Sequence, residues 1–282
     1  MDTIHDKETL ASAVRSARRG GRSIGLVPTM GLLHAGHLSL IRRARSENDL
    51  VVVSVFVNPT QFGPNEDLLR YPRDPEHDLR LLASEKVDIA FFPAVGEMYP
   101  DGYTTYVAVE GPMTRNLCGR SRPLHFKGVA TVVGKLFHIA APHRAYFGQK
   151  DAQQAAVVSR MVRDLDFDVE IRVCPTVRES DGLAMSSRNT YLTPRQRADA
   201  PGIYAALRDA QAAVAAGERD ARAVIRRITE RLSAMRGAQV DYVAVVDAHS
   251  LTDVENVAGA VLIAVAVKLG CTRLIDNVRI DL

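Results

Sequence analysis

The sequence predicts an α/β protein whose larger part is an open parallel sheet with helices on both faces, followed by a smaller α/β domain. Two observations predict this fold class. Short apolar runs alternate with amphipathic helical patterns from the start of the chain to about Pro175, the order expected when crossover helices join parallel strands. The run LVVVSVFV at 50–57 is nearly continuous and β-branched, which is typical of a strand buried on both faces of a parallel sheet.

The first element is an amphipathic helix at 7–19, where Leu10, Ala13, Val14 and Ala17 recur at helical spacing. An apolar run then predicts a short strand at 24–27. Later strands are expected at 50–57, 89–92, 144–147 and 169–173, and later helices at 38–45, 75–86, 129–140 and 152–164. Between 93 and about 123 the chain is irregular and rich in Gly, Pro and Tyr.

The pattern changes after Pro175. A polar loop leads to Thr193-Pro194, a pair typical of an N-cap followed by proline at the first helical position. Two helices rich in Ala and Arg are expected at 194–215 and 221–235, and strands at 240–246, 260–267 and 274–280. We therefore predict two domains, 1–175 and 176–282, and expect the second to act as a lid.

Composition excludes several classes of protein. The 282 residues are 46% hydrophobic with a formal net charge of only +3, and the basic residues are dispersed among acids, so neither nucleic acid nor a membrane is the expected ligand. No apolar run of about 18 residues is present, and the start MDTIHDKETL is not a secretory signal. The cysteines at 118, 174 and 271 are far apart, which predicts free thiols in a cytoplasmic protein.

Ligands of open parallel sheets bind outside the carboxyl ends of the strands. The segments that follow the expected strands are therefore the places where functional residues should lie. Four of them carry polar or Gly-rich sequences: 28–37, 58–63, 148–151 and 175–189.

His34 and His37 lie three residues apart in PTMGLLHAGH (28–37), between an expected strand and an expected helix. If the helix begins near Ala35, both imidazoles project from its first turn, where free N–H groups and the helix dipole favour an anion such as phosphate. Gly31 and Gly36 would let a bulky ligand approach the backbone. Capping histidines and a metal site are the alternatives, but no spaced carboxylate or cysteine completes a metal site.

Three other segments suit a phosphorylated ligand or a small polar substrate. Lys150 follows Gly148 at a second strand end, where it would place a fixed positive charge. Ser186, Ser187 and Arg188 bring two hydroxyls and a guanidinium together, a combination that suits phosphate oxygens. Uncharged amides complete the set at Asn58, Gln61, Gln153 and Gln154, which suit hydroxyls and carboxylates of a substrate beside the nucleotide.

Common nucleotide and hydrolase motifs are absent from the sequence. There is no G-x-x-x-x-G-K-[ST] loop, no G-x-G-x-x-G after the first strand, no G-x-S-x-G elbow and no H-E-x-x-H. The motifs that are present resemble the H-x-G-H and M-S-S-R signatures of the nucleotidyltransferase and class I synthetase superfamily. Within it, the chain closely resembles the pantothenate synthetase (pantoate–β-alanine ligase) family. The residues that carry this resemblance are PTMGLLHAGH (28–37), FVNPTQF (56–62), YPRD (71–74), HFKGVATVV (125–133), FGQKDAQQ (147–154), PTVRESDGLAMSSRN (175–189) and TRLIDN (272–277).

The resemblance implies a Rossmann-like first domain, a cytoplasmic homodimer and a reaction in two steps. ATP, accompanied by Mg²⁺, and (R)-pantoate give pantoyl adenylate and pyrophosphate, and β-alanine then displaces AMP to give pantothenate. It also implies the site residues. ATP would be bound by Met30, Gly31, Leu32, Leu33, His34, Ala35, Gly36, His37, Gly148, Gln149, Lys150, Asp151, Val177, Met185, Ser186, Ser187 and Arg188.

Gln61 would contact pantoate and β-alanine, and Gln154 would contact pantoate. The catalytic residues would be His37 as the acid-type group, His34, Lys150, Ser186, Ser187 and Arg188, with no covalent nucleophile and no metal held by the protein. Asp78 is a candidate outer-shell partner of Mg²⁺. Gln149 and Ala152 depart from the usual family pattern. The alternatives are a nucleotidyltransferase that stops at a nucleotidylated product and a non-catalytic relative that binds nucleotide or RNA.

Overall fold

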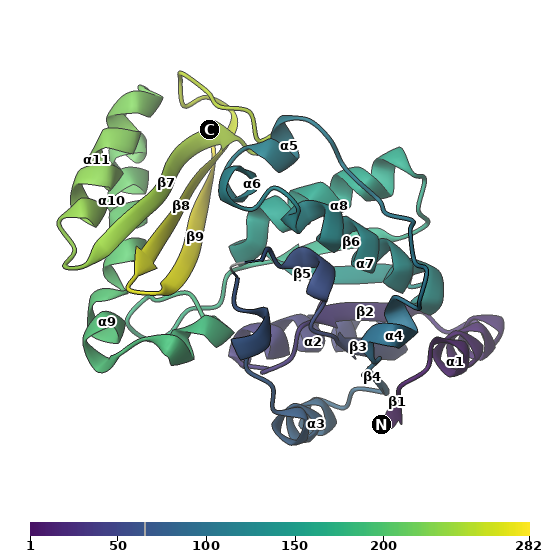
Figure 1. The fold of residues 1–282 in the computed structure, drawn as a ribbon. Helices are drawn as coiled ribbons and strands as arrows, with labels where there is room; N and C mark the ends of the chain where they lie inside the picture. Colours follow the sequence, from purple (N-terminus) through teal and green to yellow (C-terminus); the bar gives the residue numbers. More distant parts are fainter. Residues whose placement is uncertain (65) are drawn as a thin grey trace. The chain divides into compact units, whose positions relative to one another are not determined.

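The computed structural model describes residues 1–64 and 66–282, which divide into two compact units (Figure 1). Unit 1 comprises 1–109, 122–148 and 157–175, and unit 2 comprises 110–121, 149–156 and 176–282. The second domain was expected to begin at residue 176. In the structure, two short segments from earlier in the chain, 110–121 and 149–156, also belong to unit 2.

Unit 1 contains a six-stranded sheet in which every neighbouring pair of strands is parallel. The order across the sheet is β1-β4-β3-β2-β5-β6. The strands are β1 (Asp2–Ile4), β2 (Ile24–Thr29), β3 (Leu50–Val55), β4 (Ile89–Phe91), β5 (Arg144–Gly148) and β6 (Glu170–Cys174). The predicted open parallel sheet is thus confirmed. Sequence reasoning missed β1, because Ile4 is its only apolar residue, whereas the equally short β4 is apolar throughout.

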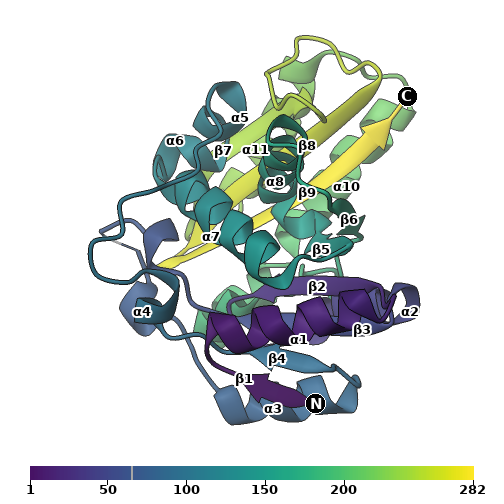
Figure 2. The same ribbon diagram turned by 90° about the vertical axis from the view of Figure 1, so that its right-hand side faces the viewer.

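Helices cover both faces of this sheet, as predicted. On one face, α1 (Lys7–Arg19) and α7 (His125–Ala140) lie side by side (Figure 2). On the other face, α2 (Ala35–Glu47) and α3 (Pro75–Ser84) pack on the strands. The core there joins Ile41 of α2 and Leu82 of α3 to Val27, Val51 and Val53 of the central strands.

The strand order determines where a ligand site can form. From β2 the chain builds outward through β3 and β4 on one side, and later through β5 and β6 on the other. The direction of winding therefore reverses between β2 and β5, which are paired in parallel. Their carboxyl ends, Thr29 and Gly148, flank the switch point at which open α/β sheets bind ligands.

Unit 2 is built on an antiparallel sheet of β7 (Ala238–Asp247), β8 (Ala260–Leu269) and β9 (Thr272–Asp281). Its core joins this sheet to α10 (Gly202–Ala215) and α11 (Ala221–Ser233). The prediction of one helix over 194–215 was wrong, since α9 (Pro194–Asp199) ends before Pro201 and α10 starts after it. Proline lacks an N–H and its ring collides with the carbonyl of the preceding turn, so it separates the two helices.

The remaining elements are short, apart from one helix whose residues are divided between the units. They are α4 (Val95–Met98), α5 (Pro112–Arg115), α6 (Cys118–Ser121) and the 3₁₀ turns η1 (Pro59–Gln61), η2 (Leu68–Arg70), η3 (Gln149–Asp151) and η4 (Ser187–Tyr191). The divided helix, α8 (Ala152–Asp164), begins in unit 2 and continues in unit 1.

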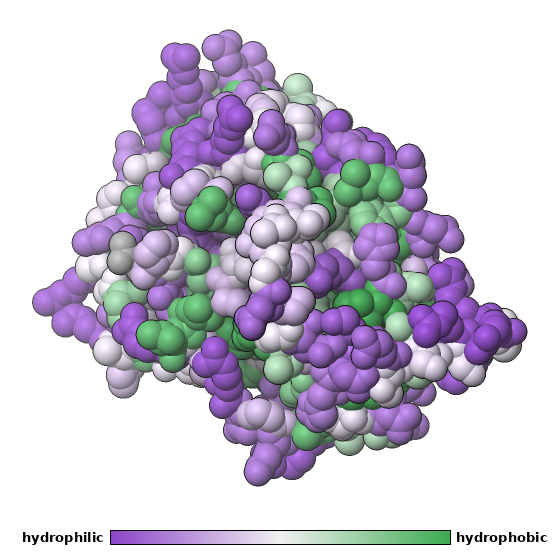
Figure 3. All heavy atoms as spheres, turned by 45° about the vertical axis from the view of Figure 1, so that its right-hand side comes forward, coloured by the Kyte–Doolittle hydropathy of each residue, from purple (hydrophilic) through white to green (hydrophobic). Residues whose placement is uncertain are grey.

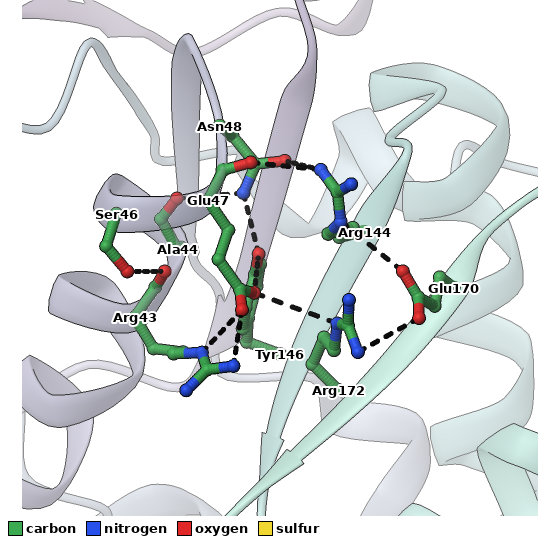
Figure 4. A network of polar contacts seen from close by, with 9 residues as sticks. All are labelled: Arg43, Ala44, Ser46, Glu47, Asn48, Arg144, Tyr146, Glu170 and Arg172. Carbon is green, nitrogen blue, oxygen red and sulfur yellow. Dashed lines mark hydrogen bonds and ion pairs between the residues drawn. The ribbon is translucent and has the colours of Figure 1, made fainter.

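A polar network ties the C-terminal end of α2 to β5 and β6 (Figure 4). The Glu47 carboxylate accepts from Arg43 Nε at 2.6 Å and from the Tyr146 hydroxyl at 2.8 Å, and it lies 3.7 Å from Arg172 Nε. The hydrogen bond from Arg43 is the main reason why the pKa of Glu47 is lowered. Burial, reinforced by the nearby Glu47 carboxylate, raises the pKa of Tyr146 to about 12, so its hydroxyl stays a donor.

Hydrophilic side chains predominate on the face drawn in Figure 3, and hydrophobic ones occur there in small separate groups. No helix among the described residues is long and apolar enough to cross a membrane. All three cysteines have free thiols, and only that of Cys271 is exposed.

Candidate active site

The turn from β2 to α2 carries the two histidines, and both serve the start of the helix. His34 is the N-cap of α2 in extended conformation, and its Nδ1 accepts from the Gly36 N–H at 3.1 Å. His37 Nδ1 accepts from the His34 N–H at 3.3 Å. The pair is a reciprocal capping box in which imidazoles replace the usual hydroxyl and carboxylate.

This arrangement selects one tautomer for each ring. A ring nitrogen that accepts from a backbone N–H carries no proton, so each neutral imidazole is protonated on Nε2. His34 and His37, whose ring centroids are 4.1 Å apart, thus each carry an Nε2–H donor. Two paired donors at a helix N-terminus suit an anionic ligand.

The backbone before the histidines is held by a residue from α3. Asp78 is buried, and its two oxygens accept from the Leu32 N–H at 3.0 Å and the Leu33 N–H at 2.7 Å. These bonds hold Gly31 (φ 82°) and Leu32 (φ 47°) in the left-handed region, which leucine rarely adopts. A Cβ at Gly31 would lie 2.9 Å from Asp78 Oδ2 and 2.9 Å from Val55 Cγ1. Glycine is therefore needed at position 31 for close packing against Asp78 and Val55. The sequence alone did not reveal this reason for glycine.

Burial raises the pKa of Asp78, although the two N–H donors act in the opposite direction. The two N–H donors therefore favour the ionised form of Asp78 against the effect of burial.

A chain of hydrogen bonds fixes the orientation of Gln61. Asn58 is buried, and its Nδ2 donates at 3.1 Å both to the Gly128 carbonyl and to Gln61 Oε1. A carbonyl can only accept, so Asn58 presents its nitrogen to Gln61, and Gln61 Oε1 must be the acceptor. Gln61 Nε2 is on the other side, where one of its two N–H groups donates to Met30 Sδ at 2.9 Å. The side chain thus presents its nitrogen, and not its oxygen, toward Met30.

Tyr99 stands at the beginning of that chain. Its hydroxyl donates to Asn58 Oδ1 at 2.9 Å. Burial raises the pKa of Tyr99 to about 12, which keeps the hydroxyl protonated. Tyr99, together with the N–H and hydroxyl of Thr60 and the Gly128 carbonyl, thus sets the orientation of Asn58, and through it that of Gln61.

The HFKG segment at the start of α7 explains the position of η1. His125 Nδ1 donates to the Gln61 carbonyl at 2.9 Å. A Cβ at Gly128 would lie 2.4 Å from the Thr60 carbonyl oxygen and 2.6 Å from Gln61 N. Only glycine lets the helix approach the turn that carries Gln61 so closely.

In unit 2, Asn277 of β9 holds the Gln149–Lys150 turn. Its Nδ2 donates to the carbonyls of Gln149 and Lys150 at 2.9 and 3.0 Å, and its Oδ1 accepts from Gln149 Nε2 at 3.0 Å. Lys150 is partly buried, with its Nζ 3.8 Å from Asp151 Oδ2.

The segment 177–188 folds back on itself before η4. The Met185 N–H donates to the Val177 carbonyl at 3.0 Å, and Arg178 and Ala184 form an antiparallel bridge. Ser186 is the N-cap of η4, since its Oγ accepts from the Arg188 N–H at 3.3 Å, and Ser187 is buried. We call 177–185 the hairpin below.

Gln153 and Gln154 have different environments. The Gln153 side chain is buried and entirely engaged by backbone, because it accepts from Cys118 N and donates to the carbonyls of Met113 and Asn116. Its expected contact with substrate is therefore wrong. Gln154 is partly buried in the first turn of α8, and its contact with pantoate stays a prediction.

Each unit thus gathers its own share of the predicted residues. In unit 1, Met30–His37 follow β2, Gln61 follows β3 and Gly148 is the last residue of β5. The carboxyl ends of these three strands share one edge of the sheet. Unit 2 contains Gln149–Asp151, Gln154, Val177 and Met185–Arg188. The supporting roles of Asp78, Tyr99 and Asn277 were missed, although Asn277 lies in the TRLIDN segment of the resemblance.

Comparison with known proteins agrees with this geometry. The model of the pantoate-beta-alanine ligase family matches residues 2–279. The chain is 56% identical to the pantothenate synthetase of Acetivibrio thermocellus over 100% of its own length and 99% of that protein. It is 57% identical to the pantothenate synthetase of Moorella thermoacetica, with the same coverage.

Solved structures give the same result. Pantothenate synthetase from Thermus thermophilus superposes with a TM-score of 0.94 at 48% identity, covering 99% of both chains. The ligase from Francisella tularensis, crystallised with beta-gamma ATP and beta-alanine, superposes with a TM-score of 0.81 at 36% identity, covering 99% of this chain and 97% of its own. This chain therefore belongs to the pantoate-beta-alanine ligase family.

Proposed function

We propose that this protein condenses (R)-pantoate with β-alanine at the expense of ATP. A pantoate carboxylate oxygen attacks the α-phosphorus of ATP and pyrophosphate leaves, giving pantoyl adenylate. The β-alanine nitrogen then attacks the acyl carbon, loses a proton and displaces AMP, giving pantothenate. The observation that carries the proposal is the imidazole capping box of α2, which provides two Nε2–H donors in a chain of this family.

The first step builds negative charge on the phosphoryl oxygens and on the departing pyrophosphate, so it needs positioned donors and cations. His34 and His37 in unit 1, and Lys150, Ser186, Ser187 and Arg188 in unit 2, provide these groups. The other ATP-binding residues expected from the resemblance are likewise divided between unit 1 and unit 2. The Francisella relative supports both substrates, because its structure is a complex with beta-gamma ATP and beta-alanine.

Pantoate carries a carboxylate and hydroxyls, and all of their oxygens can accept hydrogen bonds. The hydrogen bonds that run from Tyr99 through Asn58 orient Gln61 so that its nitrogen is available as a donor. An N–H donor suits the oxygens of such a substrate. Gln154 is the second proposed contact for pantoate. Asn58 orients Gln61 and does not itself contact the substrate in this proposal, since both ends of its amide are bonded to protein groups.

Mg²⁺ enters with ATP in this proposal and is held by the phosphates. Among residues 1–64 and 66–282, no three His, Cys, Asp or Glu side chains are grouped so as to hold a metal ion. The resemblance supports a homodimer in the cytoplasm as the working form of the enzyme.

The decisive experiment measures exchange of labelled pyrophosphate into ATP with pantoate present and β-alanine omitted. Exchange that depends on pantoate is expected, because adenylate formation is reversible. Without such exchange, the adenylate mechanism fails. A second assay follows AMP release after β-alanine is added. AMP release that does not require β-alanine would identify a nucleotidyltransferase instead of a ligase.

A further inference from the structure

The last strand of unit 2 carries two adjacent buried polar residues, Asp276 and Asn277, which are 4% and 5% exposed. We propose that they are positioning residues for nucleotide binding, which hold the Gln149–Lys150 turn and the hairpin in one frame. This inference rests on the proposed function, because it assigns Lys150 and Met185–Arg188 to the nucleotide. Neither Asp276 nor Asn277 touches the ligand in this proposal.

The Asn277 carboxamide has one orientation only. Its Nδ2 donates to two carbonyls, those of Gln149 and Lys150, at 2.9 and 3.0 Å, and carbonyls cannot donate in return. Its Oδ1 consequently faces Gln149 Nε2, which donates to it at 3.0 Å. One buried side chain therefore fixes both carbonyls and the side chain of Gln149.

Fixing two carbonyls also fixes two N–H groups. In a planar trans peptide the C=O and the N–H point in opposite directions. The peptide N–H groups of Lys150 and Asp151 are therefore directed away from Asn277. Successive N–H groups that point to one side form a concavity suited to an anion, and the Lys150 side chain leaves the backbone between them.

Asp276 connects the same strand to the hairpin. Its Oδ1 accepts from the Asn277 N–H at 2.8 Å, and both oxygens accept from Arg178 at 2.6 and 3.0 Å. The Arg178 guanidinium also donates to the Gly182 carbonyl at 3.2 Å and lies 3.5 Å from the centre of the Tyr204 ring. Arg178 is thus bound to Asp276, the Gly182 carbonyl and the Tyr204 ring, and the hairpin that precedes Ser186 is fixed to β9.

A double-mutant cycle between Asn277→Ala and Lys150→Ala tests the inference. Pantoate-dependent pyrophosphate exchange and the Kd for Mg·ATP by titration calorimetry are measured in the wild type, both single variants and the double variant. Asn277→Ala is expected to weaken Mg·ATP binding about tenfold, the loss that corresponds to one or two buried hydrogen bonds. Its KM for pantoate should change by less than about twofold.

Coupling is the signature of a positioning residue. If Asn277 acts through the turn, adding Asn277→Ala to Lys150→Ala should weaken Mg·ATP binding by clearly less than the tenfold loss expected in the wild-type background. The Lys150 ammonium is then already absent, and only the backbone N–H groups of Lys150 and Asp151 can still be displaced. Losses that multiply across the cycle would overturn the inference, and so would an Asn277→Ala variant with the affinity of the wild type. A wild-type protein that shows no pantoate-dependent exchange would instead overturn the proposed function.

Asn48→Ala is the matched control. Asn48 is a similarly buried asparagine whose amide bonds the Ala44 carbonyl, the Tyr146 hydroxyl and Arg144, in unit 1 before the start of β3. Its removal should lower the melting temperature about as much as Asn277→Ala does. The affinity for Mg·ATP should stay at the wild-type value, so a loss of affinity in Asn277→Ala alone is not a general effect of destabilisation.

Discussion

In the proposed function His34 has two roles, one for each ring nitrogen: Nδ1 caps α2, and Nε2–H stabilises charge on the nucleotide. Substitutions can separate the two roles. His34→Asn keeps an acceptor near the position of Nδ1 and removes Nε2, because asparagine is itself a good N-cap. The variant should therefore fold with wild-type stability and lose about 10²-fold in pyrophosphate exchange, the scale for one charge-stabilising donor. Exchange kinetics and thermal unfolding check both expectations.

His34→Gln is the complementary variant. Its longer side chain places an N–H near Nε2 and gives up the cap. We expect the free energy of unfolding to fall by about 1 kcal/mol, with exchange retained better than in His34→Asn. If the two variants behave alike in both assays, the division of work between the two nitrogens is wrong.

Tyr99 tests the orientation of Gln61. Tyr99→Phe removes one of three donors to Asn58 Oδ1, the others being the N–H and the hydroxyl of Thr60, and so holds the Asn58 amide less firmly. It should raise the KM for pantoate about 2- to 10-fold, the effect of one net hydrogen bond. The KM for ATP should not change. Tyr103→Phe is the control, because Tyr103 packs against the Tyr99 ring at 5.0 Å. A rise in the KM for pantoate as large in Tyr103→Phe would contradict the role of Tyr99.

At the scale of single residues, the sequence predicts what is local. The spacing of His34 and His37 placed both at the start of a helix, and the structure confirms that position. It does not reveal Asp78 or Asn277 as supports, because their partners lie 45 or more and 127 or more residues away. A side chain that bonds backbone across such distances leaves no period or motif.

At the scale of elements, α7 offers a matched pair of glycines. Gly128→Ala would drive a Cβ into the backbone of η1 and should destabilise the protein by about 1–3 kcal/mol, as overpacking does. It should also raise the KM for pantoate, since η1 carries Gln61. Urea unfolding and steady-state kinetics measure the two effects.

Gly134→Ala is the control on the same helix. A Cβ there would meet its nearest neighbour at 3.8 Å, an ordinary contact, and alanine favours helix by up to about 1 kcal/mol over glycine. This variant should be as stable as the wild type or more so. A loss of stability equal to that of Gly128→Ala would show that backbone approach is not the reason for glycine at 128.

The junction of α2 with β5 and β6 predicts a pH dependence. The pKa of Glu47 is lowered in the folded protein, whereas in the unfolded chain it is about 4.3. Its stabilising contribution is therefore present above about pH 4 and is lost as the pH falls further. Glu47→Gln should lower the free energy of unfolding at pH 7, and its difference from the wild type should shrink toward pH 3. A difference that stays constant between pH 7 and pH 3 would contradict this role.

The elements themselves were largely predictable, since buried strands and amphipathic helices repeat at periods of 2 and 3.6 residues. The start and end of α1 and α8 agree with prediction. The break at Pro201 is not apparent from the Ala-rich pattern, which continues on both sides of the proline and favours a single helix.

At the scale of the whole molecule, the units are interleaved along the chain, and no sequence pattern shows this. Gln153 bonds the backbone of 113–118, and Asn277 bonds the 149–150 turn, so unit 2 is completed by residues that precede 176. The division into units is set by contacts between residues that are distant in the sequence, which no local pattern records.

Interleaving predicts how the chain behaves when it is divided. Fragments 1–175 and 176–282, produced from separate genes in one cell, should co-purify as a one-to-one complex, because segments of the first complete unit 2. Arg273→Ala should weaken the complex, since Arg273 contacts Cys118 Sγ at 3.5 Å. A fragment 176–282 that elutes alone as a folded monomer would contradict the expectation.

The position of β9 in the chain has a consequence during translation. Every residue of unit 1 has been synthesised by residue 175, well before Asp276 and Asn277 are added to the chain. Until β9 is available, the turn at 149–150 and the hairpin lack the hydrogen bonds that Asn277 and Asp276 make to them. A nascent chain stopped before residue 272 would thus carry every proposed catalytic residue but lack the strand that holds the turn and the hairpin, so we expect it to bind ATP more weakly than the full chain.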